Sequence, residues 1–192
     1  ASVAALSACT LFSYTSTPLP AASPTPQPTT STAAAKPSSC GNPLASYRPT
    51  GLLVTPATLP SGSTMAKIQK RGRLVAGVSA DTYLLGSRNP LTGEIEGFDI
   101  DMVKAVTEAI FGNENRYQLK VITAAQRIPA LEKGDVDIVA RNMTINCDRW
   151  KQIAFSTEYY RSGQKILVRK GSKANSINDL DGQKVCAPKG TS

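Results

Sequence analysis

The sequence predicts an α/β domain with a parallel sheet, preceded by a leader that carries almost no charge. After residue 63, short apolar runs alternate with amphipathic helical patterns, which is the rhythm of strand–helix–strand units. Before that point the only charged residues are Lys36 and Arg48, and residues 1–62 contain 10 of the 13 prolines. The roughly 130 residues that follow are enough to bury an apolar core.

Five short runs are expected to be strands, and the first of them is apolar throughout. They lie at 74–78, 119–122, 136–140, 165–169 and 184–187. Residues 89–93, Asn-Pro-Leu-Thr-Gly, are typical of a turn between two short extended pieces.

Helical patterns separate these strands. Ser63 caps a short helix at 65–70, and Asp99 is expected to cap a longer one that ends at Gly112. The apolar residues expected on one face of that longer helix are Val103, Val106 and Ile110. Two further helices are expected, one at 125–133 that ends before Gly134 and a short one that holds Arg149 and Trp150.

In parallel sheets, ligands bind outside the carboxyl ends of the strands. The segments expected at that edge are 79–83, 124–127, 141–144 and 188–191. This edge is therefore the predicted place of a binding site.

The chain contains no histidine, and this excludes several kinds of site. A Ser-His-Asp or Cys-His pair, a histidine-ligated zinc or haem and an imidazole base all need that side chain. The net charge of +8 would suit nucleic acid, a membrane surface or an anionic ligand. Acids are mixed with the bases, and no aromatics interleave with the basic stretch 165–173, so we expect no nucleic-acid partner. No phosphate-binding glycine loop is present, and we expect no cofactor.

The leader is typical of an exported lipoprotein. Residues 6–9, Leu-Ser-Ala-Cys, match the bacterial lipobox, so residues 1–9 are expected to be the remnant of a trimmed signal peptide, with Cys9 as the lipidated residue. Residues 10–62 are expected to be a disordered Ser/Thr/Pro/Ala-rich linker, because such a composition cannot bury a core. Two acyl chains would anchor the protein stably to the outer face of the cell membrane.

Several short motifs occur in a fixed order between Leu74 and the end of the chain. They are 97–101 (Gly-Phe-Asp-Ile-Asp), 128–131 (Ile-Pro-Ala-Leu), 134–138 (Gly-Asp-Val-Asp-Ile), 143–145 (Met-Thr-Ile), Arg149, 155–156 (Phe-Ser) and 159–160 (Tyr-Tyr). In this order and spacing they resemble the polar amino-acid group of the bacterial extracellular solute-binding proteins, the receptors of ABC importers. Within that group the resemblance is strongest to glutamine/glutamate/aspartate-binding lipoproteins.

The resemblance implies a periplasmic-binding-protein-like type II fold, in which two α/β lobes joined by a hinge close on one amino acid. It places lobe 1 at 63–163, incomplete without a C-terminal return, and the start of lobe 2 at 164–192. We therefore expect a chain truncated within the second lobe, which binds amino acids weakly if at all. The acid that meets the ligand ammonium is expected beyond Ser192.

The resemblance also implies a set of ligand-binding residues. Arg149 matches the arginine that grips the α-carboxylate, and a planar guanidinium suits a carboxylate because it binds it bidentately. Thr144 matches a hydroxyl that holds the ligand, and Asn142 a backbone carbonyl that accepts from the ammonium. Gly190 and Thr191 match the second-lobe loop whose free N–H groups meet the same carboxylate.

The identity of the amino acid depends on Arg127. In relatives that bind acidic amino acids an arginine at this place contacts the distal carboxylate, whereas the alternative is a surface charge at the start of a helix. Ser79, Asp81 and Tyr83 are expected to line the rim of the first lobe, although some acidic-ligand relatives carry lysine at the Ser79 position. Asp81 is expected to pair either with the ammonium or with Arg127. Glutamate and aspartate thus come ahead of glutamine and asparagine.

Three cysteines follow Cys9. A bond between Cys147 and Cys186 would join the two lobes and oppose hinge closure. Some relatives pair a cysteine at the Cys186 position with a later cysteine of the second lobe. The resemblance therefore implies a disulfide between Cys40 and Cys147.

Three classes of function are compatible with this fold. The first is a receptor that delivers an amino acid to the membrane permease of an ABC importer, as a monomer. The second is a sensor whose closed form contacts a membrane signalling protein. The third is a dehydratase-like enzyme, with Glu158 or Asp81 as the acid. The arginine motif favours binding of an amino acid without a chemical reaction, so we do not expect the protein to be an enzyme.

Overall fold

The computed structural model describes residues 40–45, 55–163 and 165–191, and all structural statements below concern these residues. The lipobox with Cys9 and most of the expected linker lie outside them. Within the described residues, no helix combines the length and the apolar composition that crossing a bilayer requires.

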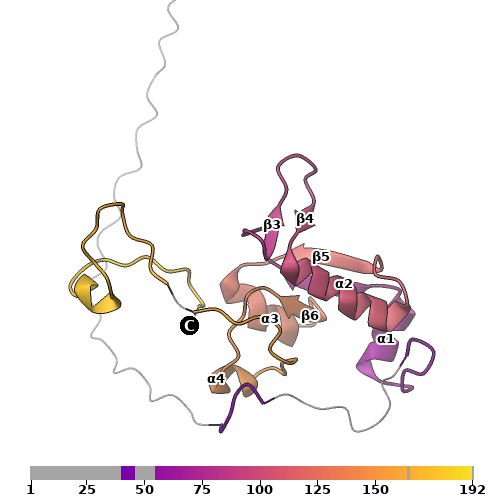
Figure 1. Cartoon of the computed structure of the whole chain (residues 1–192). Helices are drawn as coiled ribbons and strands as arrows, with labels where there is room; N and C mark the ends of the chain where they lie inside the picture. The colour runs from indigo at the N-terminus through magenta and orange to yellow at the C-terminus, as the bar shows by residue number, and fades with distance from the viewer. Residues whose placement is uncertain (1–39, 46–54, 164, 192) are drawn as a thin grey trace, which may run out of the picture. The chain divides into compact units, whose positions relative to one another are not determined.

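A three-stranded parallel sheet forms the centre of the fold (Figure 1). Strand β1 (Leu74–Val78) lies between β5 (Tyr117–Val121) and β6 (Ile138–Ala140), with Leu74 opposite Tyr117 and Ala76 opposite Ile138. The central strand is apolar along its whole length because both of its faces are covered, as parallel strands require. The three predicted strands of this sheet are confirmed, with β5 beginning two residues earlier and β6 two residues later than expected.

Helix α2 (Phe98–Phe111) packs on this sheet, and α1 (Thr64–Arg71) packs against α2 and adds Ile68 to the core. The Ser63 hydroxyl caps α1 by accepting a hydrogen bond from the Ala66 amide over 3.1 Å, as predicted. The buried core consists of Ile68, Leu74, Ala76, Val78, Ile100, Val103, Ile110 and Ala140.

Two expectations for α2 are wrong. Its N-cap residue is Gly97, and Asp99 lies within the first turn with 1% of its surface exposed. The Asp99 carboxylate accepts hydrogen bonds from other parts of the chain, so it does not cap its own helix. Val106 is 37% exposed, and Thr107 takes the buried place instead, because spacings of three and four residues align it with Val103.

A small antiparallel sheet projects from this core as a hairpin (Figure 1). It comprises β2 (Asp81–Thr82), β3 (Gly86–Arg88) and β4 (Ile95–Glu96). The expected turn at 89–93 closes the hairpin, and the Asn89 carbonyl accepts from the Gly93 amide over 2.8 Å.

The helix expected at 125–133 is divided into a 3-10 turn, η1 (Ala124–Gln126), and a short helix, α3 (Arg127–Glu132). Pro129 explains the division, because it has no N–H to donate to the carbonyl four residues earlier. The short helix with Arg149 is present as α4 (Cys147–Trp150).

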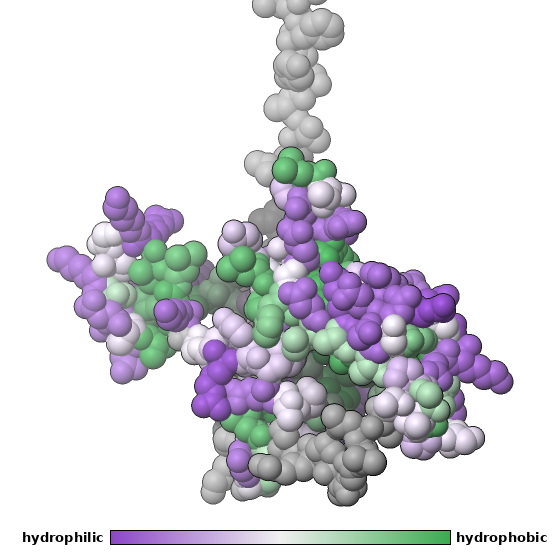
Figure 2. Space-filling model, turned by 45° about the vertical axis from the view of Figure 1, so that its right-hand side comes forward, coloured by the Kyte–Doolittle hydropathy of each residue, from purple (hydrophilic) through white to green (hydrophobic). Residues whose placement is uncertain are grey.

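Beyond residue 163, the described chain contains one regular element, the 3-10 helix η2 (Ile177–Leu180). The strands expected at 165–169 and 184–187 are therefore not formed. A strand requires a neighbour that takes up its backbone hydrogen bonds, and the described residues offer none to these runs. Their apolar side chains stay exposed, Leu167 at 99%, and hydrophobic surface is visible in this part of the chain in Figure 2.

Replacing Gly97 by alanine is expected to lower the stability of the fold strongly. Its φ of 127° is one that glycine adopts and residues with a side chain rarely do. A Cβ atom there would also lie 2.6 Å from the Leu85 carbonyl oxygen. We expect Gly97→Ala to cost about 3 kcal/mol, or roughly 6–12 °C in Tm by thermal unfolding. Gly93→Ala is the matched control, since Gly93 has φ 76° with open space around it, and about 1 kcal/mol is expected. Equal losses in the two variants would contradict the role of the Leu85 contact.

Candidate functional site

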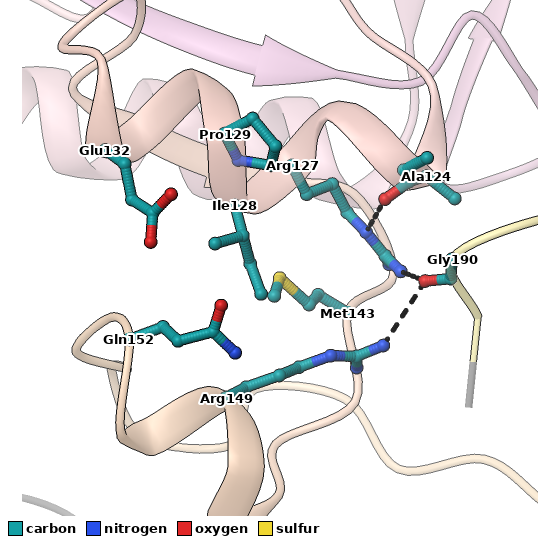
Figure 3. A pocket seen from close by; sticks show the side chains of 10 residues that line it. Ala124, Arg127, Ile128, Pro129, Glu132, Met143, Arg149, Gln152 and Gly190 are labelled. Carbon is teal, nitrogen blue, oxygen red and sulfur yellow. Dashed lines mark hydrogen bonds between the residues drawn. The ribbon is translucent and has the colours of Figure 1, made fainter.

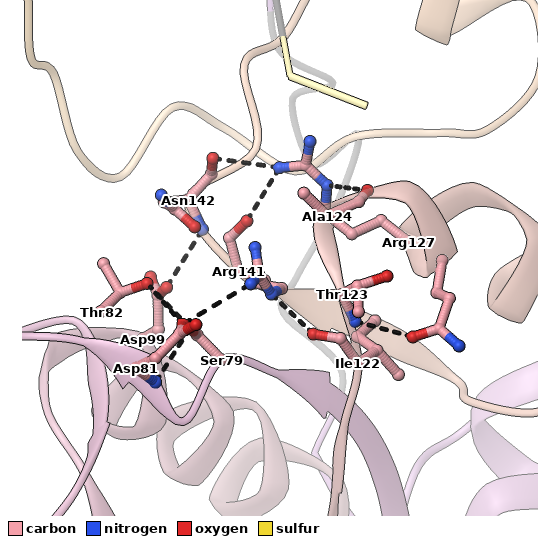
Figure 4. Close-up of polar contacts among 11 residues, drawn as sticks. Ser79, Asp81, Thr82, Asp99, Ile122, Thr123, Ala124, Arg127, Arg141 and Asn142 are labelled. Carbon is pink, nitrogen blue, oxygen red and sulfur yellow. Dashed lines mark hydrogen bonds and ion pairs between the residues drawn. The ribbon is translucent and has the colours of Figure 1, made fainter. Parts of the chain in front are cut away.

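The carboxyl ends of the three parallel strands meet in a polar cluster (Figure 4). Ser79 directly follows β1, is fully buried, and donates its hydroxyl to the Asp81 carboxylate over 2.6 Å. Arg141 directly follows β6, donates to the Ile122 carbonyl over 2.8 Å, and lies 3.6 Å from the Asp81 carboxylate. The Ser79 hydrogen bond, and then the Arg141 charge, hold the pKa of Asp81 below its usual value. The arginine paired with Asp81 is therefore Arg141, and not Arg127 as one of the two expected pairings had it.

Arg127 is a buried cation, only 3% exposed, whose guanidinium contacts backbone carbonyls. The acceptors are the carbonyl oxygens of Ala124 at 2.9 Å, Arg141 at 3.1 Å, Asn142 at 3.2 Å and Gly190 at 2.8 Å. A guanidinium has five N–H donors, so these four bonds leave one N–H for any further acceptor. Arg127 is thus not a surface charge at a helix start; it joins three segments of backbone, at 124, 141–142 and 190.

Arg149 lies opposite Arg127 and reaches the same carbonyl (Figure 3). Its guanidinium donates to the Thr144 carbonyl over 2.7 Å and to the Gly190 carbonyl over 3.4 Å. Its backbone amide donates to the side chain of Asn146, the N-cap of α4, over 3.0 Å. Burial lowers the pKa of Arg149, and burial followed by the neighbouring Arg149 and Arg141 charges lowers the pKa of Arg127 to about 10. Arginine stays protonated at neutral pH, so this pair of guanidinium groups suits an anionic group.

A pocket of about 280 Å³ lies between α3, α4 and Gly190 (Figure 3). Its volume is close to the lower end, about 300 Å³, of small-molecule sites. The lining combines the two arginines, the polar ends of Glu132 and Gln152, and an apolar wall of Ile128, Pro129 and Met143. Such a lining suits a small molecule with a carboxylate and a short polar side chain.

Asn142 is hydrogen-bonded through both its backbone N–H and its backbone carbonyl, at a φ of 29° that non-glycine residues seldom adopt. Its N–H donates to the Asp99 carboxylate over 3.1 Å, and its carbonyl accepts from Arg127. The other oxygen of Asp99 accepts from the Tyr159 hydroxyl over 2.7 Å, and burial together with Asp99 raises the pKa of Tyr159. The segment expected to meet the ligand ammonium is therefore fixed between a buried anion and a buried cation.

Three further predicted site residues, Gly190, Thr191 and Tyr83, differ in how close they lie to the two arginines. Gly190 contacts both arginines, and a Cβ there would lie 2.7 Å from the Ala125 Cα, so the close approach needs glycine. The Thr191 hydroxyl donates to the carbonyl of Pro188 within its own loop. Tyr83 is 81% exposed and is not among the residues that line the pocket.

The sequence analysis does not predict Glu132 and Gln152 in the lining of the pocket. Nor does it predict the roles of Arg141 and Asp99 in the polar contacts around it. Arg141 falls within the predicted segment 141–144, and its position directly after a predicted strand is the signal that could have identified it. The sequence predicts a helix cap at Asp99, and nothing local in the sequence points to its partners 43 and 60 residues further on.

The structure contains a disulfide between Cys40 and Cys147, whose Cα atoms lie 5.4 Å apart. This is the pairing that the resemblance implied. Cys186 is exposed, and its thiol is free.

A buried parallel sheet with a cationic pocket at its carboxyl edge defines one lobe of an α/β binding protein, and the fold is the periplasmic-binding-protein type II fold. The model of the bacterial extracellular solute-binding proteins, family 3, matches residues 74–190, and the chain belongs to this family.

Relatives of known sequence agree with this assignment. The chain is 45% identical over 130 residues to the glutamine-binding protein of Geobacillus stearothermophilus, covering 67% of this chain and 50% of that protein. It is 46% identical over 129 residues to the ABC transporter glutamine-binding protein GlnH of Bacillus subtilis, covering 67% of this chain and 47% of that one. The chain thus spans about half the length of these relatives.

Solved structures agree on the fold. The ancestral amino acid-binding protein AncCDT-1, a precursor of cyclohexadienyl dehydratase, is 38% identical with a TM-score of 0.57, covering 62% of this chain and 52% of its own. A variant of the arginine-bound ArgBP of T. maritima is 32% identical with a TM-score of 0.56, covering 61% of this chain and 54% of its own.

Proposed function

We propose that this chain belongs to an extracellular receptor that binds a polar L-amino acid and delivers it to the membrane permease of an ABC importer. The observation that carries the proposal is the pair of guanidinium groups, Arg127 and Arg149, that meet at the pocket beside Gly190. Arg149 provides the bidentate grip on the α-carboxylate, and Thr144 and Asn142 supply further polar contacts. The glutamine-binding and general amino-acid-binding relatives support the same function.

For the side chain of the ligand we propose an amide, with L-glutamine first. The sequence alone placed the acidic amino acids ahead, on the expectation that Arg127 contacts a distal carboxylate. Four of the five N–H groups of Arg127 are already engaged by carbonyls, which leaves too few donors for a bidentate carboxylate contact. The names of the two glutamine-binding relatives point the same way.

We further propose that Cys9 carries the lipid that anchors the receptor, as a monomer, to the outer face of the cell membrane. The lipobox sequence and the proline-rich leader support this. A sensor that signals to a membrane protein would use the same site and differ only in its partner.

We do not propose an enzyme. The two acids considered for a dehydratase are engaged elsewhere, Asp81 by Ser79 and Arg141, and Glu158 by Arg161 over 2.8 Å. The curated relatives named above are binding proteins.

Calorimetric titration of the full-length protein tests the proposed ligand. We expect L-glutamine to bind at least about tenfold more tightly than L-glutamate, because a buried second carboxylate would find no bidentate partner. L-Asparagine and L-aspartate serve as shorter comparators. Tighter binding of L-glutamate would restore Arg127 as the distal contact, and absence of binding to all four would overturn the proposed function.

A further inference from the structure

Helix α4 carries Arg149 but has little of its own to hold it in place. It spans four residues, Cys147–Trp150, and none of them is buried. A single turn of helix is unstable alone, because the cost of nucleation is not recovered over so few residues. The orientation of Arg149 therefore depends on contacts from outside the helix.

Two such contacts come from residues 40–45, which we call the N-terminal strap. Cys40 is bonded to Cys147, the first residue of α4. The Pro43 carbonyl accepts from the indole N–H of Trp150, the last residue of α4, over 2.8 Å. The strap is thus attached at both ends of the helix, from 107 residues away in the sequence.

Further contacts fix the strap and the end of the helix where they meet. Within the strap, Asn42 accepts from the Leu44 amide at its side chain and from the Ala45 amide at its carbonyl, and this turn contains Pro43. The Trp150 ring also packs edge-on against Phe155, with centroids 5.2 Å apart. Trp150 is therefore fixed between the strap and the chain that follows α4.

We propose that the N-terminal strap is a positioning element of the amino-acid site. By holding α4 at both ends, it keeps the Arg149 guanidinium directed at the pocket, where it already reaches Thr144 and Gly190. Cys40, Cys147 and Trp150 are positioning residues, since they act through Arg149 and do not line the pocket. This inference rests on the proposed function, because it assigns Arg149 to the ligand.

The test uses the full-length protein and L-glutamine as the titrant. Non-reducing peptide mapping first identifies the disulfide, and a bond between Cys147 and Cys186 would overturn the inference. Cys40→Ser and Cys147→Ser, singly and together, are expected to raise the Kd about 3- to 30-fold, with no additional loss in the double variant. Cys186→Ser is the matched control and should leave the Kd unchanged.

Trp150→Phe keeps an aromatic ring beside Phe155 and removes the indole N–H donor, so it tests the strap even if a cysteine variant fails to fold. We expect it to raise the Kd about threefold or more with the disulfide intact. A Kd unchanged in both Trp150→Phe and the folded cysteine variants would overturn the inference.

A double-mutant cycle separates positioning from general stability. In an Arg149→Lys background, loss of the strap should change the Kd less than about twofold, because the bidentate group that it positions is gone. The same fold-change in both backgrounds would show that the strap acts on the fold alone. If the unmodified protein does not bind L-glutamine, the proposed function fails first; if it binds and the strap variants bind equally well, the strap inference alone fails.

Discussion

Replacing Arg149 by alanine is expected to raise the Kd for L-glutamine about 30- to 5,000-fold in the full-length protein, or about 2–5 kcal/mol. The loss is large because a desolvated α-carboxylate would lose its bidentate partner. Thr144, whose carbonyl now accepts from Arg149 over 2.7 Å, offers no positive charge in its place. Calorimetry, or competition with a labelled ligand where binding is weak, gives the ratio.

Two further variants make this result specific. Arg149→Lys keeps the charge and loses the planar pair of donors, so an intermediate Kd is expected. Arg161→Ala is the matched control, since Arg161 is an exposed arginine paired with Glu158, outside the pocket. If Arg149→Ala binds as tightly as Arg161→Ala, the assignment of Arg149 to the α-carboxylate is wrong.

Arg127→Ala is expected to weaken glutamine and glutamate binding by the same factor and to lower the stability of the fold. The reason is that Arg127 holds the carbonyls of Arg141 and Asn142, so its loss releases the segment that presents Asn142 to the ligand. A buried acceptor left without a partner costs about 1–3 kcal/mol, and we expect at least about 2 kcal/mol in total, or roughly 4–8 °C in Tm.

The selectivity of the loss distinguishes the two interpretations of Arg127. If Arg127 contacts the distal carboxylate, the alanine variant should lose glutamate binding and keep glutamine binding. If Arg127 instead holds the backbone, the alanine variant should lose binding of both ligands. Arg127→Lys should then recover only part of that binding, because an ammonium lacks the fixed fork of donors that reaches four carbonyls. Lys133→Ala, an exposed cation directly after α3, is the control for charge. A selective loss of glutamate binding would overturn the backbone role of Arg127.

Much of the first lobe follows from local sequence. The apolar run Leu74–Val78 predicts a buried strand, Ser63 predicts a cap, and the turn at 89–93 predicts the hairpin, and all three are present. Each of these features depends on residues within a few positions of one another. Periodicity and turn chemistry are sufficient for them.

The interpretations that failed depend on partners far away in the chain. Local sequence predicts a helix cap at Asp99 because Asp is common there, yet its carboxylate accepts from Asn142 and Tyr159. For Arg127 the sequence leaves two alternatives, contact with the ligand or exposure to solvent, whereas its guanidinium contacts carbonyls up to 63 residues away. The runs 165–169 and 184–187 have strand-like composition, but a strand also needs a neighbour. Pairing partners of this kind are fixed by tertiary structure, which a single sequence does not display.

The central claim is that Arg149, positioned by α4, holds the α-carboxylate of a polar amino acid in the pocket beside Arg127. The most direct measurement is a crystal structure of the full-length protein with L-glutamine bound. We predict two hydrogen bonds of about 2.7–2.9 Å between the ligand α-carboxylate and the Arg149 guanidinium, with Arg127 still bonded to the carbonyls of Arg141 and Asn142. An α-carboxylate held away from Arg149, or a distal group bound by Arg127, would contradict the account.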